Sequence, residues 1–473
     1  MNDKKKYWDD FLNPVLVKEM RQFFHNRLLL SLAGGLLGVQ LLVLFVFNLT
    51  FSEWKEFSEA GTVFIVIDTA LMYLCVLAVA VWDPMNRFIA ERSSKELDFS
   101  NITLLSPWQI VGGKLASALV IWGLIASLCL PFMTVAYFFR NVTLKDILLI
   151  FGAGVMPALV LIQAALFCGS LGKKWVQALF VYFVLQVIGP LTIVSLAPML
   201  DHRNFGFINF CIFQGGWLML FAMLLAATIA MITPPFSNRM MPLRILLCIL
   251  LVPLLITAFF METFHREPQY LILFMIMGAT AFSGFLAVCD RDEPGGRVLA
   301  QVPRNPAGRF LHYLFSSNRC GGVVFSLILL LIFALVSVLL AARMKEAMAL
   351  ITFSIAAYII CYCEIAIILN RKVPSMPGWG WLLVVSFALG VIPMVAAANS
   401  DIKVSQIWIS PCSLLGNGRY HHTVTDPAIW AAPLAAWGIG LLFVIEMFRK
   451  YKNYKAPEKK SNGSALQGEE KKI

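Results

Sequence analysis

Long apolar blocks alternate with short polar segments along almost the whole chain. Each block approaches the roughly 20 residues that a helix needs to cross about 30 Å of hydrocarbon. Because every backbone N–H and C=O in lipid needs an internal partner, each block is predicted to be a helix. We therefore predict an all-α polytopic membrane protein with about twelve transmembrane helices. The twelve predicted spans cover residues 28–50, 62–82, 113–137, 146–171, 175–199, 208–232, 243–261, 270–289, 322–342, 347–370, 378–399 and 428–448.

Composition and charge agree with this class. Hydrophobic residues make up 59% of the chain and charged residues 14%, whereas a soluble domain carries about 25% charged residues. With the N-terminus placed inside, 29 of the 38 Lys and Arg residues fall on the inner side and 9 on the outer side. This asymmetry predicts that both termini are cytoplasmic. The net charge of +11 then reflects topology and anionic lipid, and no nucleic acid partner is expected.

The segment before the first span has its own pattern. Asn13-Pro14 predicts a helix start, because Asn caps well and Pro suits the first helical position. Leu16, Met20 and the Phe23-Phe24 pair then share one face of the helix. Residues 1–27 are thus predicted to be a cytoplasmic tail and an interfacial amphipathic helix that leads into an uncleaved first span. A plain anchor on the membrane surface explains the same pattern.

The polar segment between the second and third spans carries two helix-start signals. Ser93 and Glu96 have the spacing of a capping box. Ser106-Pro107, followed by Gln109, predicts a second start. Lys114 then marks the cytoplasmic edge of the third span. A short helix, a turn and a fresh helix are therefore predicted here.

The order NPVLVKEMRQFFHNR, two spans, ERSSKELDF, LSPWQIVGGK and further spans resembles the permease subunit of ATP-binding-cassette type 2 transporters. The resemblance covers roughly residues 1–235. It implies that the first helix is the connecting helix and that the loop after the second span holds a coupling helix, which docks on a separate ATPase. The docking element would comprise Glu91, Arg92, Lys95, Glu96, Leu97, Asp98 and Phe99. Ser106, Pro107, Gln109 and Lys114 would begin the third span. The family often has Gly-Thr at Lys95-Glu96, which leaves the register of the docking residues open.

The chain divides into four predicted parts. The N-terminal segment 1–27 is followed by a type 2 permease-like domain at 28–235, a further six-span domain at 236–448, and a basic tail at 449–473 that is expected to be disordered. The loop 290–319 occupies the place of a second coupling loop but does not repeat the first motif. A solvated loop with positive-inside residues is the preferred interpretation, and a divergent docking loop is the alternative.

The sequence shows no motif for chemistry of its own. No Walker-type spacing occurs, since GSLGKKW (169–175) and GGKLAS (112–117) both lack it. The ten cysteines follow no disulfide or zinc pattern. No catalytic residue, metal or cofactor is therefore expected. Asp68 and Glu364 fall inside predicted spans, where ionisable residues mark function by default; for both residues, a structural hydrogen bond or access to water is the alternative.

The leading hypothesis is the permease subunit of an ATP-driven exporter in a bacterial inner membrane. Its expected partners are a separate ATPase, a second permease copy or paralogue, and the lipid bilayer. One rival is a secondary transporter of twelve spans, for which the few charges inside spans are a poor basis. Another rival is a membrane scaffold of an envelope complex without transport.

Overall fold

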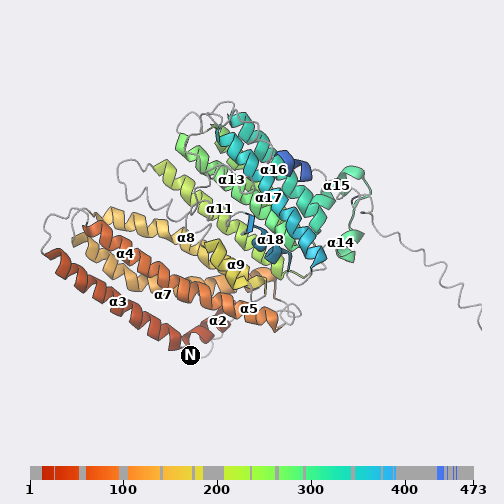
Figure 1. The fold of residues 1–473 in the computed structure, drawn as a ribbon. Helices are drawn as coiled ribbons and strands as arrows, with labels where there is room; N and C mark the ends of the chain where they lie inside the picture. Colours follow the sequence, from red (N-terminus) through yellow and green to blue (C-terminus); the bar gives the residue numbers. More distant parts are fainter. Residues whose placement is uncertain are drawn as a thin grey trace, which may run out of the picture. The chain divides into compact units, whose positions relative to one another are not determined.

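A computed structural model of the chain is built of helices over the residues that the structure describes (Figure 1). No strand occurs among the residues that the structure describes. Those residues are 13–25, 27–52, 60–94, 105–138, 142–172, 176–184, 207–234, 237–260, 266–290, 294–341, 347–373, 377–386, 388–389, 434–440, 445, 451 and 454.

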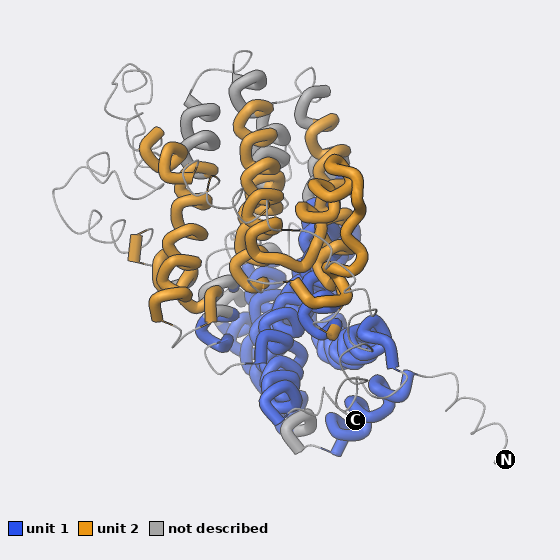
Figure 2. Tube along the Cα trace, turned by 90° about the vertical axis from the view of Figure 1, so that its right-hand side faces the viewer, with its two compact units in different colours: residues 1–233, 261–272 blue, residues 234–260, 273–473 orange. Residues whose placement is uncertain are grey.

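The chain folds into two compact units, shown in Figure 2. Unit 1 comprises residues 1–233 and 261–272, and unit 2 comprises residues 234–260 and 273–473. The helices of residues 13–232 are α2 (Pro14–Phe24), α3 (Arg27–Ser52), α4 (Ala60–Cys75), the π-helix η1 (Val76–Trp82), α5 (Asp83–Ser93), α7 (Pro107–Val135), the 3₁₀ turn η2 (Ala136–Phe138), α8 (Leu144–Ser170), α9 (Val176–Phe183) and α11 (Phe207–Ile232). The remaining labelled helices are α12 (Met241–Phe260), α13 (Arg266–Cys289), α14 (Gly296–Ala300), α15 (Pro306–Phe315), α16 (Arg319–Ala341), α17 (Ala347–Lys372) and α18 (Gly378–Ser386).

Six helical segments among the described residues are long and apolar enough to cross a membrane. They cover Ser31–Leu49, Val63–Ser93, Pro107–Phe138, Ile147–Ser170, Gln214–Ile232 and Arg319–Val336. Two shorter apolar helices cover Met241–Thr257 and Met275–Cys289. These helices are those of a membrane protein by length and composition, while the total of twelve spans stays a prediction. Most of the predicted span at 175–199 lies outside the described residues.

The second membrane helix is longer than its apolar block. It runs from α4 through η1 into α5 without a break, and its candidate span of 31 residues is about 45 Å long at 1.5 Å per residue. The hydrocarbon layer takes up only about 30 Å of that length. The π segment ends directly before Asp83-Pro84, where the proline lacks the N–H that an α-helix would use. The helix therefore extends well past the predicted boundary at residue 82.

The predicted helix start at Ser93 is wrong. Ser93 is the last residue of α5, and its hydroxyl donates a hydrogen bond to the carbonyl of Ala90 one turn earlier. Ser93 and Glu96 have the spacing of a capping box. That spacing alone does not show whether a helix already precedes the serine, as α5 does here. The second membrane helix therefore continues through Ser93, and the rest of the predicted short helix, residues 95–99, lies outside the described residues.

Two other predicted helix starts are confirmed. The Asn13 side chain accepts a hydrogen bond from the backbone N–H of Val15 and caps α2, with Pro14 as its first residue. Ser106 and Gln109 form a reciprocal capping box at the start of α7. The predicted apolar face of α2 is only partly confirmed, because Phe24 is exposed whereas Glu19 is buried beside Phe23.

Helix α2 packs directly against the first turns of α7. The Asn13 amide donates to the carbonyl of Gln109 at 2.6 Å, so the cap of one helix also binds the other. A Cβ atom added at Gly113 would lie 2.7 Å from Cβ of Val15 and 3.1 Å from the backbone nitrogen of Leu16. Only glycine permits this approach, because a methyl group there would overlap the backbone of α2.

We expect Gly113→Ala to displace α2 from α7 and to lower the thermal midpoint of the purified chain. The neighbouring change Gly112→Ala is the matched control, because a Cβ atom there meets nothing within 4 Å. Alanine favours a helix by about 1 kcal/mol over glycine, so the control should be neutral or slightly stabilising. Thermal unfolding in mild detergent measures both variants, and equal midpoints would contradict the packing described here.

Candidate functional site

Four charged side chains from three helices meet where α2, α5 and α7 come together. Lys114 of α7 forms ion pairs with Glu19 of α2 and with Glu91 of α5, the second at 2.8 Å. Lys18 of α2 also pairs with Glu91, at 3.0 Å. We call Lys18, Glu19, Glu91 and Lys114 the ion cluster. It joins the first amphipathic helix, the end of the second membrane helix and the start of the third.

The ion pairs differ in how far they are buried, and only a well-buried pair is expected to contribute strongly to stability. The Lys114 side chain is 4% exposed and that of Glu19 is 8% exposed, whereas the Lys18 side chain is 51% exposed. The Lys114 ammonium also lies 5.0 Å from the centre of the Phe88 ring, a favourable cation–π distance. The four charges cancel, so the cluster holds a buried cation between two carboxylates without excess charge. Removing one member of such a pair leaves its partner buried and uncompensated.

A second set of contacts packs α5 against the end of α8. A Cβ atom at Gly169 would lie 3.0 Å from Cβ of Phe88, and one at Gly172 would lie 2.1 Å from Cγ of Arg92. Gly172 also has φ of +68°, a conformation that favours glycine. The Arg92 guanidinium donates to the carbonyl of Met231 at the end of α11. Gly169 and Gly172, from the segment that lacks Walker spacing, thus allow the close packing of α5.

The proposed docking residues fall into two groups. The side chains of Glu91 and Arg92 are half-buried and bonded within the chain, to Lys114 and to Met231 respectively. The other five proposed residues lie outside the described residues, namely Lys95, Glu96, Leu97, Asp98 and Phe99. Ser106, Pro107 and Gln109 form the first turn of α7, and Lys114 points into the ion cluster. Glu19 was not predicted from the sequence. Its signal is that an acidic residue lies one turn before Phe23, on the buried face of α2.

Asp68 has a structural partner. It is 2% exposed, and Oδ1 accepts a hydrogen bond from Nε2 of the buried Gln40 at 2.7 Å. Gln40 lies on α3 and Asp68 on α4, so this polar contact links the first two membrane helices. Interhelical hydrogen bonds of this kind hold membrane helices together, which favours the structural alternative for Asp68.

Glu364 has a different environment. The residue is 1% exposed, and neither carboxylate oxygen has a hydrogen-bond partner within the described part of unit 2. A Cβ atom at Gly440 would lie 3.6 Å from Oε1, beside Ile360. An ionised carboxylate in such surroundings is costly. Glu364 is therefore the strongest intramembrane functional candidate in unit 2.

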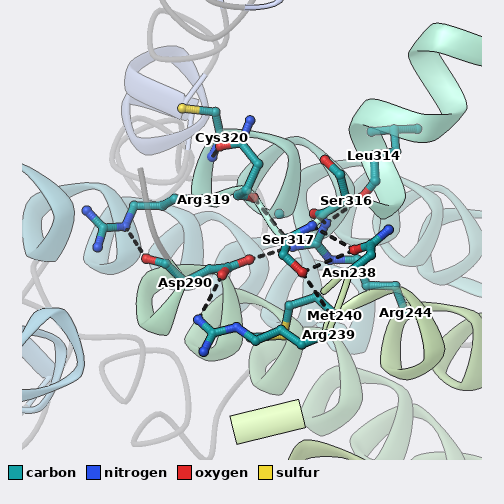
Figure 3. Close-up of polar contacts among 12 residues, drawn as sticks. Asn238, Arg239, Met240, Arg244, Asp290, Leu314, Ser316, Ser317, Arg319 and Cys320 are labelled. Carbon is teal, nitrogen blue, oxygen red and sulfur yellow. Dashed lines mark hydrogen bonds and ion pairs between the residues drawn. The ribbon is translucent and has the colours of Figure 1, made fainter. Parts of the chain in front are cut away.

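Unit 2 has a polar cluster of its own, drawn in Figure 3. Asp290, at the end of α13, pairs with Arg239 at 3.1 Å and with Arg244 at 3.5 Å. Arg244 also donates to the carbonyl of Leu314 at the end of α15 and to that of Ser316 in the connection to α16. Since Asp290 is 1% exposed and Arg244 5%, this cluster fixes α12, α13 and α15 to one another.

Tyr451 and Tyr454 pack against α15. The Tyr454 hydroxyl lies 3.0 Å from Nδ1 of His312. The Arg309 guanidinium lies 5.3 Å from the centre of the Tyr451 ring. Tyr313 lies between them, with ring centres 5.3 Å from Tyr451 and 5.1 Å from Tyr454. Burial lowers the pKa of His312 and raises the pKa of Tyr454. We call these contacts the tyrosine clamp.

The ion cluster holds helices and offers no reactive group. No set of three His, Cys, Asp or Glu side chains within the described ranges could hold a metal ion. Separating the three helices at this buried, charge-balanced junction would leave a charge uncompensated.

We expect Lys114→Met to lower the free energy of unfolding by about 3–5 kcal/mol, because it leaves Glu19 and Glu91 without their buried cation. Lys18→Met is the control and should cost at most about 1 kcal/mol, since its ion pair with Glu91 is exposed to solvent. Denaturant titration of both purified variants gives the comparison. Similar losses for the two lysines would show that the buried cation does not hold the junction.

Replacing Glu364 by Gln should leave the thermal midpoint unchanged or raise it, because Gln keeps the shape and removes a buried charge that has no partner among the described residues. Asp68→Leu is the comparison, and it should weaken the link between α3 and α4, because it removes the oxygen that accepts the hydrogen bond from Gln40. A large drop in the thermal midpoint for Glu364→Gln alone would mean that Glu364 is held ionised by a cation.

The tyrosine clamp should weaken in acid. The pKa of His312 in the folded chain lies below its ordinary value of about 6.5, so the folded state binds fewer protons than the unfolded state. The His312 contribution is therefore fully present above pH 6.5 and decreases as the pH falls below that value. The thermal midpoint of wild type relative to His312→Gln should thus decrease between pH 8 and pH 5, and a constant difference would contradict this assignment.

Comparison with known protein families, with curated proteins and with solved structures finds no match to this chain. Fold alone does not specify function, which resides in particular sites. Any function proposed for this protein therefore rests on the geometry of its own residues.

Proposed function

We propose that this chain is the membrane permease subunit of an ATP-driven transporter of the type 2 class, acting as an exporter in a bacterial inner membrane. A separate ATPase hydrolyses ATP, and a second permease copy completes the assembly. The chain itself carries no nucleotide site and no cofactor in this proposal. The docking surface is the segment after α5, with Leu97 and Phe99 as apolar contacts.

The observation that carries the proposal is the joining of α2, α5 and α7 by the ion cluster. A force applied to a flexible loop would be lost in the loop. Here the segment that would receive the force follows directly on a continuous helix that reaches from Ala60 to Ser93. Displacement of the end of α5 would therefore move the second membrane helix, and through Lys114 it would move the first and third helices as well.

A second candidate function is a twelve-span secondary transporter, and the buried Glu364 favours it. Ion-coupled carriers use intramembrane carboxylates that take up and release protons or cations. Glu364 has the required burial and, within the described part of unit 2, no hydrogen-bond partner. The ion cluster, however, has no role in such a mechanism, so the ATP-driven proposal accounts for more of the structure.

The test is recovery of an ATPase with the tagged chain from its own membranes in mild detergent. We expect a co-purifying protein with the P-loop sequence G-x-x-x-x-G-K-[ST] at a fixed ratio to the permease. Leu97→Ala combined with Phe99→Ala should reduce recovery at least tenfold, because apolar and aromatic anchors at interfaces are each worth about 2 kcal/mol or more.

Lys95→Ala is the control for that double variant and should retain the ATPase, since a charge at the rim of an interface contributes little. Permease yield in the same membranes separates loss of docking from loss of folding. Wild-type recovery by the double variant would place the docking surface elsewhere, and the loop at 290–319 would be tested next. Absence of any ATPase from wild-type preparations would favour the secondary transporter.

A further inference from the structure

One short pattern occurs twice in the chain, at the same spacing. Asn-Pro is found only at 13–14 and at 305–306, and each is followed by Asn-Arg, at 26–27 and at 318–319. All four residues are related by a single offset of 292 positions. In each case the proline begins a short helix and the arginine begins a long apolar helix, giving α2 and α3 in one case and α15 and α16 in the other.

The correspondence continues beyond the first long helix. The next long helix passes or reaches a further Asn-Arg pair, Asn86-Arg87 in α5 and Asn370-Arg371 in α17. A Pro and a Trp then come at the start of the following helix, as Pro107-Trp108 in α7 and as Pro377 and Trp379 around the first turn of α18. Internal repeats of this kind are common in membrane transporters.

The two copies differ where the first one is proposed to dock. In the first copy 20 positions separate Arg87 from Pro107, and in the second copy only 6 positions separate Arg371 from Pro377. The second copy is therefore 14 residues shorter in the connection that corresponds to the docking segment. Too few residues remain to form a helix of two turns and its flanking turns.

The ion cluster is missing from the second copy as well. The offset of 292 aligns Glu19 with Leu311, which is 55% exposed. Counting from the aligned prolines, Lys114 corresponds to Val384, which is 46% exposed. Neither position can form the buried ion pair that joins α2 to α7. The second short helix is fixed by other means, namely Arg244 and the tyrosine clamp.

We propose that residues 305–386 are a second, divergent copy of the module at 13–135, one that keeps the amphipathic helix and the membrane helices and has lost the ATPase-docking segment together with its ion cluster. One chain then presents one docking surface. This inference rests on the function proposed above and specifies its stoichiometry: each permease chain binds one ATPase chain.

The experiment is native mass spectrometry of the complex purified from membranes through the tagged full-length chain. We expect equal numbers of permease and ATPase chains. In a variant that lacks residues 95–104, all bound ATPase should be lost, while Glu91 and Arg92 keep their contacts in α5. In the matched variant, Arg304→Ala combined with Leu311→Ala, the equal ratio should persist, because Leu311 lies in the second copy and Arg304 directly precedes it.

The outcomes separate the two proposals. Two ATPase chains for each permease chain, or ATPase that is retained after the first connection is shortened, would overturn the single docking surface while supporting the ATP-driven function. Loss of half the ATPase in the Arg304→Ala, Leu311→Ala variant would likewise overturn it. No ATPase in any preparation would overturn both. Circular dichroism of each variant checks that its helices are intact.

Discussion

Unit 1 depends on one buried cation. Lys114 lies on a helix that is otherwise apolar for most of its length, and its ammonium is held by Glu19 from one side and Glu91 from another. In a chain with so few charged residues, two carboxylates and an ammonium are brought into a buried position only if they compensate one another. The amphipathic helix, the second membrane helix and the third membrane helix are therefore fixed to a common point.

The same buried cation also holds the end of the long second helix in place. An extension beyond the hydrocarbon layer would be free to bend if it stood alone. Here it is held on one side by Lys114 and on the other by α8, where Gly169 and Gly172 allow close approach to Phe88 and Arg92. The end of α5 is thus a firmly packed helix rather than a loop. The proposed function requires such a rigid segment at this place.

Local signals in the sequence predicted local structure well. The Asn13-Pro14 and Ser106-Pro107 starts are confirmed, because a cap depends on residues within one turn of it. The end of the second helix was placed too early, because Asp83-Pro84 and the charges that follow are typical of a helix end. Packing against α8 and a π segment carry the helix through that point. Residues 95–104 lie outside the described part of the chain, so the docking element remains a prediction.

The ion cluster could not be predicted from the sequence. Glu19 and Lys114 are 95 positions apart, and Lys18 and Glu91 are 73 apart. Each residue separately is typical of a charge at a membrane boundary, and only the fold brings them together. The two Asn-Pro pairs are a short pattern in the sequence, and the structure adds that a short helix begins at each of the two prolines.

We infer that α2 and α5 move as one body when the proposed ATPase binds nucleotide. Spin labels at Gln22 on α2 and Ser93 on α5, both at exposed positions, report the distance between these helices by pulsed electron resonance. We expect one narrow distance distribution that is the same without nucleotide and with a non-hydrolysable ATP analogue, and a broad one when Lys114 is replaced by Met. A wild-type distance that changes between the two nucleotide states, with the fold intact, would contradict the account.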